Sequence, residues 1–130
     1  MNAEYIHLVK LLKSIQRFKI EIHSVTKYHS SIDPKSTLGV QKLKGMLENQ
    51  VRSSNCAFIL PEIFVSNPFW IKKALYLCQM YGVSPLVLSP KNGEDLPAEL
   101  YIKSKAIIAW NIESLEEGVR TFSTTRFGAT

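Results

Sequence analysis

The fold is decided by the stretch CAFILPEIFVSNPFWIKKA, residues 56–74. Its first five residues form a continuous apolar run, which is typical of a strand covered by helices on both faces. Pro61 removes a ladder donor, so we expect the strand to end there and a loop to follow. A helix then begins near Trp70 and continues through apolar positions to Gly82, which is placed to cap it. Trp70 is therefore expected near the carboxyl end of a strand, where open α/β sheets bind ligands.

Helix and strand patterns alternate along the rest of the chain. Helices are predicted at 3–16, at 40–53 and from Ser114 onward, strands at 18–23, 86–88 and 106–110, and loops at 26–39 and 91–100, the last with one short helical turn. Ser114, followed three residues later by Glu117, predicts a capping box on the final helix. The loop at 26–39 is long for a compact domain, and such loops are often functional. The pattern predicts an α/β fold, a doubly wound, flavodoxin-like parallel sheet of about four strands flanked by helices.

Length, charge and cysteine usage limit the kinds of protein that this chain can be. We treat residues 1–130 as a single domain whose polar tail, 123–130, is expected to fray. No leader pattern and no apolar run of bilayer length is visible, so we expect a cytoplasmic protein without a membrane partner. The net charge of +5 arises in residues 1–53, where basic side chains are dispersed. Dispersed charge does not favour nucleic acid as a partner. The two cysteines lack the spacing of a metal site or a disulfide framework.

Three short motifs occur in an order that resembles the Toll/interleukin-1 receptor (TIR) domain. They are His23-Ser24-Val25 after the first predicted strand, Trp70-Ile71-Lys72-Lys73 on the third helix, and Ile107-Ile108-Ala109-Trp110-Asn111 followed by Ser114-Leu115. Over residues 6–122 the chain is most similar to the TIR-like subfamily of bacterial Thoeris antiphage sensors and to related archaeal flavodoxin-like proteins. The resemblance implies a domain that hydrolyses or cyclises NAD, or one that assembles immune-signalling complexes.

The resemblance also indicates which parts of the enzymatic site differ here. Enzymatic members of the family carry a glutamate four residues after the tryptophan, and this chain has Ala74 there. A carboxylate beside the ribose stabilises the oxocarbenium-like state of nicotinamide–ribose cleavage, which alanine cannot do. Glu62 is the nearest acidic residue in sequence, but it follows the strand and is expected to lie away from the helix face.

The resemblance further implies that a first strand, which would precede the helix at 3–16, is missing. In that case the strands at 18–23 and 56–60 would be separated by an open slot in the sheet. Unpaired buried backbone groups are costly, so the slot cannot stay empty. The two strands either pair directly or accept a strand from a second chain.

Three functions remain open from the sequence. The first is a catalytically silent TIR-like interaction module in prokaryotic antiphage signalling, a homo-oligomer or a partner of another TIR protein. The second is an NAD-cleaving or cyclising enzyme completed by another subunit, and the third is a domain that binds a nucleotide messenger. No cofactor is required, although NAD or a derived nucleotide could serve as a ligand.

The candidate ligand-binding residues are Ser24, Lys27, Phe69, Trp70, Lys72 and Lys73, and no catalytic or metal-binding residue is assigned. Trp70 is either the stacking wall of a nucleotide pocket or a core aromatic. Lys72 and Lys73 follow a helix N-terminus, an end that attracts anions such as phosphate. For the silent module, charge reversal at Lys27 and Lys35 is expected to weaken self-association or partner binding while leaving the fold intact.

Overall fold

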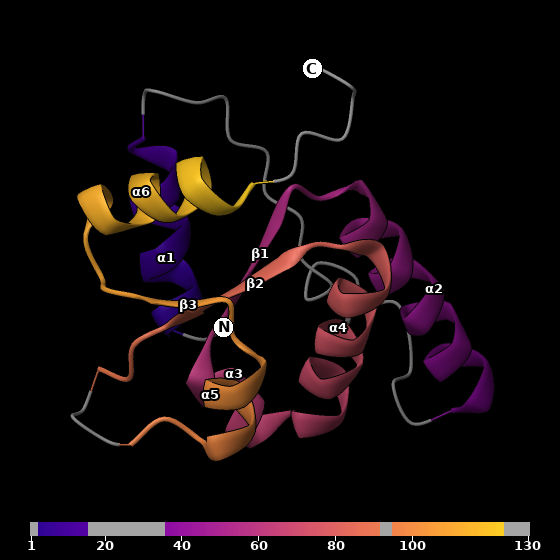
Figure 1. The fold of residues 1–130 in the computed structure, drawn as a ribbon. Helices are drawn as coiled ribbons and strands as arrows, with labels where there is room; N and C mark the ends of the chain where they lie inside the picture. The colour runs from indigo at the N-terminus through magenta and orange to yellow at the C-terminus, as the bar shows by residue number, and fades with distance from the viewer. Residues whose placement is uncertain (1–2, 16–35, 92–94, 124–130) are drawn as a thin grey trace.

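A computed structural model describes residues 3–15, 36–91 and 95–123 of the chain. Within these residues, three parallel strands form one sheet in the order β1-β2-β3, and helices lie on both of its faces (Figure 1). The elements are α1 (Ala3–Lys13), α2 (Thr37–Ser53), β1 (Cys56–Ile59), α3 (Pro61–Ser66), α4 (Pro68–Tyr81), β2 (Ser84–Leu88), α5 (Ala98–Lys103), β3 (Ala106–Ile108) and α6 (Ile112–Phe122). The predicted α/β class and parallel sheet are confirmed, with three strands in the described residues where about four were expected. The strand expected at 18–23 lies outside the described residues.

Alternate residues of the strands pack against different helical layers, as the pleat of a sheet requires. Leu86 and Leu88 of β2 and Ile108 of β3 face α1 and α6, which lie together on one side of the sheet (Figure 1). Val87, between the two leucines, faces the opposite layer and packs with Leu75 of α4. The central strand is therefore buried on both sides, which explains its uninterrupted apolar sequence. Within the described parts of the chain, no helix is both long enough and apolar enough to cross a bilayer.

Helix α4 confirms the helix predicted from Trp70 to Gly82. Gly82 has a φ of 68°, in the left-handed region, and its N–H donates to the carbonyl of Cys78. Glycine adopts this conformation without the steric cost that a Cβ would add, so the helix ends where the sequence indicated. The buried residues of the helix are Ala74, Leu75, Leu77 and Cys78, and Leu77 has only 1% of its surface exposed.

Two predicted loops, the one after Pro61 and the one at 26–39, are wrong in part. A proline explains the first difference and a helix N-cap explains the second. Residues 61–66 form helix α3 rather than a loop, since Pro61 occupies the first helical turn, where its missing N–H costs nothing. The loop predicted to reach residue 39 ends earlier, because α2 begins at Thr37. Ser36 caps that helix, and its side-chain oxygen accepts from the N–H of Gly39 at 2.9 Å.

The boundaries near the C-terminus also differ from the prediction. The strand predicted to end at Trp110 ends at Ile108, and the Trp110 indole N–H donates to the carbonyl of Ser89 at 2.7 Å. The final helix begins at Ile112, with Asn111 as its N-cap, so the predicted capping box at Ser114 is wrong. The short helical turn predicted before residue 100 is α5, which continues to Lys103, and the first helix ends at Lys13 rather than at residue 16. Ser123 is the C-cap of α6, and residues 124–130 lie outside the described residues.

Candidate functional site

Four of the six predicted ligand-binding residues lie on the first turns of α4, whereas Ser24 and Lys27 lie outside the described residues. Trp70 is half-buried and packs against the cluster that joins α4 to Leu47 and Val51 of α2. Phe69 projects outward with 53% of its surface exposed and meets the Trp70 ring edge-on, with ring centroids 5.0 Å apart. Trp70 therefore contributes to the packing between α4 and α2.

The two lysines of α4 contact different side chains. Lys72 Nζ lies 3.8 Å from a carboxylate oxygen of Glu99 on α5, in an ion pair exposed to solvent. Lys73 Nζ lies 5.2 Å from the centre of the Tyr76 ring on the same helix. The structure brings the rings of Phe69 and Trp70 into contact, while the ammonium groups of Lys72 and Lys73 contact different partners.

Ala74, the position of the glutamate in enzymatic TIR domains, faces the core. It has 9% of its surface exposed and belongs to a cluster with Leu47 and Val51 of α2 and with Leu77 and Cys78 of α4. Burial, and to a lesser degree the nearby Cys56, raises the pKa of the Cys78 thiol to about 11. A group at position 74 of this helix thus points at α2 in an apolar environment.

A stripe of large apolar side chains covers the outer face of α4. Phe69, Tyr76 and Met80 each have more than half of their surface exposed, and they recur at the seven- and four-residue spacing that aligns side chains along a helix. The neighbouring α5 adds Tyr101 and Ile102, exposed by 67% and 76%. We call these five residues the α4–α5 face.

A second group of polar and aromatic side chains lies at the carboxyl ends of the strands, where the first turns of α1 meet them. Glu62 follows β1, Lys91 follows β2 and Trp110 follows β3, while Glu4 and His7 come from α1. We call these five residues the strand-end cluster. Ligands of open α/β sheets bind at this edge because the loops that leave parallel strands converge there.

Three members of the strand-end cluster form a compact aromatic and basic unit. The His7 and Trp110 rings stack with centroids 5.1 Å apart and planes inclined by 13°. Lys91 Nζ lies 4.2 Å from the centre of the Trp110 ring and 2.5 Å from His7 Nδ1. An ammonium group can only donate, so His7 Nδ1 is the acceptor in this contact. The Trp110 indole N–H is fixed by Ser89, so the ring has a defined orientation.

The other two members are a pair of carboxyl groups. Glu4 is on the same face of α1 as Leu8 and Leu12, has only 9% of its surface exposed, and its Oε1 has no hydrogen-bond partner among the described residues. Burial, then the charge of Glu62 and a hydrogen bond with it, raise the pKa of Glu4, and the charge of Lys91 acts in the opposite direction. Two adjacent carboxyl groups favour sharing a proton or a cation, because two neighbouring negative charges repel.

Sequence reasoning missed the strand-end cluster. Its members are far apart in sequence, and only the packing of α1 over the strand ends joins them. A signal was nonetheless present, since each of the three apolar strands is followed within three residues by Glu62, Lys91 or Trp110. Glu4 on α1 has no such signal, because the helical pattern of residues 3–16 does not indicate that Glu4 lies near Glu62.

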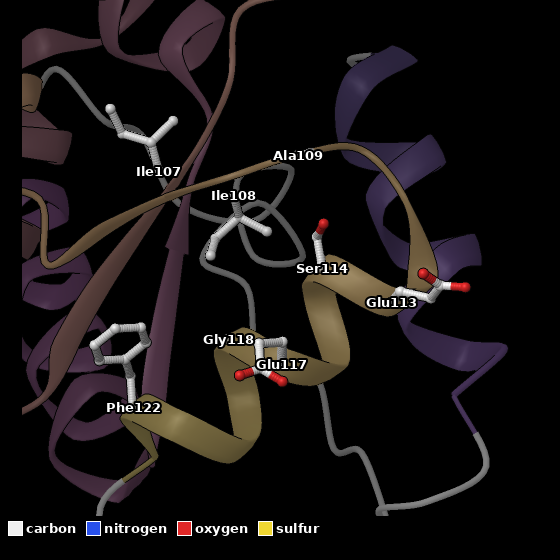
Figure 2. Close-up of a pocket in the computed structure, with 8 residues that line it drawn as sticks. All are labelled: Ile107, Ile108, Ala109, Glu113, Ser114, Glu117, Gly118 and Phe122. Carbon is white, nitrogen blue, oxygen red and sulfur yellow. The ribbon is translucent and has the colours of Figure 1, made fainter.

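A shallow, open depression of about 490 Å³ lies between β3 and α6, at an edge of the described sheet (Figure 2). It is lined by Ile107, Ile108, Ala109, Glu113, Ser114, Glu117, Gly118 and Phe122. Gly118 permits the close approach of the helix, because a Cβ there would lie 3.0 Å from Ile108 Cδ1. Glu117 pairs with Arg120 and accepts a hydrogen bond from Thr121, both on its own helix. The lining combines apolar side chains with the carboxyl groups of Glu113 and Glu117 and the hydroxyl of Ser114.

Comparison with known proteins adds no family to this description. No protein-family model, no curated protein and no solved structure matches the chain. The resemblance to TIR domains therefore stays a prediction from the sequence.

Proposed function

We propose that this chain is an interaction module that assembles with a second copy of itself through the α4–α5 face. The observation that supports the proposal most directly is the stripe on α4, in which Phe69, Tyr76 and Met80 are exposed by 53%, 54% and 52%. Single exposed apolar side chains are common on protein surfaces, but a row of three along one face of a helix is typical of an interaction site. Aromatic residues and methionine are also enriched at interfaces relative to the rest of the surface.

The charges beside the stripe suit a second copy of the same face. Lys72 and Glu99 lie on either side of the groove between α4 and α5, in a pair that is open to water on both partners. Exposed ion pairs of this kind contribute little to the stability of a monomer. In a two-fold symmetric contact the same surface of each copy faces the other. Lys72 of one copy can therefore pair with Glu99 of the second copy, and Glu99 of the first with Lys72 of the second, without any change of fold.

The resemblance to TIR-like proteins supports the same assignment and suggests its setting. We place the module in prokaryotic antiphage signalling, as a homo-oligomer or as the partner of another TIR-like protein. The alternative function, NAD cleavage or cyclisation, depends on a carboxylate near the tryptophan of the third helix. The packing of Ala74 against α2 gives that alternative no support at position 74.

The experiment is sedimentation velocity of charge-introducing variants. Tyr76→Glu and Met80→Glu place carboxylates in the stripe, and each is expected to weaken self-association at least about tenfold while leaving the circular dichroism spectrum unchanged. Ile112→Glu is the matched control, because Ile112 is exposed by 37% but lies on α6, on the opposite side of the sheet (Figure 1). Association that persists in both α4 variants, or that Ile112→Glu abolishes instead, would place the contact elsewhere.

A further inference from the structure

Strand β3 forms one edge of the sheet. In the order β1-β2-β3 it pairs with β2 alone, and no strand in the described residues lies on its other side. Ile107 in the strand and Ala109 just after it are both exposed to solvent. A strand that is bonded on one side presents its remaining N–H and carbonyl groups to solvent, so such an edge can accept a further strand.

The depression between β3 and α6 lies along this edge (Figure 2). Gly118 brings α6 close to Ile108, and Phe122 lines the depression at the far end of the helix. The volume of about 490 Å³ leaves room for side chains from another segment. An open strand edge beside a depression is the arrangement used in strand addition. Backbone hydrogen bonds then provide affinity, and pockets for alternate side chains provide specificity.

The charges near the edge differ between its two ends. Lys105 is exposed and immediately precedes β3. Glu113 is exposed in the first turn of α6, beyond the carboxyl end of β3 (Figure 2). Glu117 also lines the depression, but it pairs with Arg120, so the complementarity depends on Glu113. A segment that fits this edge carries a basic side chain at the Glu113 end and none at the Lys105 end.

We propose that β3 and the depression beside it bind an extended segment of a partner protein, which adds to the sheet next to β3. Its apolar side chains face Ile108 and Phe122, and a lysine or arginine on the same face pairs with Glu113. Side chains on one face of a strand recur at every second residue, so the segment alternates apolar and polar residues, with the basic residue at one end. The site uses β3 and α6, whereas the proposed self-association uses α4 and α5, so either proposal can fail alone.

The test uses two fluorescein-labelled peptides, Lys-Thr-Val-Thr-Val-Thr-Val and Val-Thr-Val-Thr-Val-Thr-Lys, one for each direction of the added strand. Fluorescence anisotropy is measured with the full chain and with Tyr76→Glu, which keeps contacts through the α4–α5 face out of the measurement. One peptide is expected to bind with a Kd of about 100 µM or tighter and to shift the amide NMR signals of β3.

Charge exchange tests the role of Glu113. Glu113→Lys is expected to weaken binding of the lysine peptide at least about tenfold, and replacement of the peptide lysine by glutamate is expected to restore binding to this variant. Restored binding would also show that the variant is folded. Glu48→Lys, on α2, is the matched control and is expected to bind as the parent does.

Four outcomes would overturn the proposal. Neither peptide saturates up to about 1 mM. A peptide with methylated backbone N–H groups, which keeps the side chains but cannot donate to β3, binds equally well. The glutamate peptide binds the unmutated chain as well as the lysine peptide does. Finally, self-association that persists in Tyr76→Glu and is abolished by Ile107→Asp would show that a second copy, rather than a partner protein, occupies the edge.

Discussion

At the scale of single residues, Glu4 is the group whose environment differs most from that of an ordinary surface carboxylate. It occupies a core-facing position one turn before Leu8 on α1, and Glu62 lies next to it. Burial first, and Glu62 second, raise its pKa above the ordinary value of 4.5, while the charge of Lys91 opposes them. The folded chain therefore keeps this proton to a higher pH than the unfolded chain does.

The pH dependence of stability follows from that difference. The stabilisation from protonated Glu4 is fully present below a pH of about 4.5 and is lost as the pH rises through the raised pKa of Glu4. Glu4→Gln, which cannot ionise, is expected to be more stable than the parent by about 1 kcal/mol at about pH 8, and equal to it at about pH 4.5. Urea denaturation at both pH values measures this difference. A difference that is the same at both would contradict the assignment, and Glu48→Gln is the control.

Position 74 provides a second test at this scale. Ala74 is buried against Leu47 and Val51, with no basic partner in its cluster. Ala74→Glu is expected to destabilise the fold by about 3 kcal/mol or more, since it buries an unpaired charge, and to add no NAD cleavage. Thermal denaturation and nicotinamide release measure the two effects. Gln79→Glu, at an exposed position of α4, is expected to be nearly neutral. A stable, active Ala74→Glu variant would show that position 74 faces a pocket.

At the scale of secondary-structure elements, helix ends are set by single side chains. Asn111 Oδ1 accepts from the N–H of Ser114 at 2.8 Å, which satisfies one of the free donors in the first turn of α6. Ser114 followed by Glu117 has the sequence of a capping box, but it lies one turn inside the helix. Asparagine and serine are comparably good N-caps. Asn111 lies about one turn before Ser114, so a helix capped by Asn111 is longer by that turn.

The two candidate caps make opposite predictions. Asn111→Ala is expected to lower the free energy of unfolding by about 1 kcal/mol, because it removes the side chain that caps α6. Ser114→Ala is expected to change it by less than about 0.5 kcal/mol. Chemical denaturation of the two variants side by side measures the difference. If Ser114→Ala were the less stable of the two variants, Ser114 rather than Asn111 would be the N-cap of the helix.

Much of the fold could be predicted from the sequence, because its signals are local. The buried strands and the Gly82 cap of α4 both depend on residues that are close together in the sequence. Helix α3 was missed because Pro61 can both end a strand and begin a helix, and no nearby residue distinguishes the two. The strand-end cluster could not be assembled, since the contact of Glu4 with Glu62 depends on how α1 packs over the sheet.

At the scale of the whole molecule, two surfaces are separated by the sheet. The α4–α5 face belongs to the layer that covers Val87, whereas α1 and α6 cover Leu86 and Leu88 on the other side (Figure 1). The strand-end cluster lies at the carboxyl ends of the strands, next to the first turns of α1. A module of this design can associate through one layer without covering the other.

Self-association is the central claim, and the most direct measurement of it is sedimentation equilibrium of the unmodified chain over a range of concentrations. The monomer mass is 14.7 kDa. We expect the weight-average mass to rise with concentration towards twice that value, and the rise to disappear in Tyr76→Glu. A mass that stays at the monomer value up to about 1 mM would contradict the proposal, because specific interfaces of ordinary size associate well below that concentration.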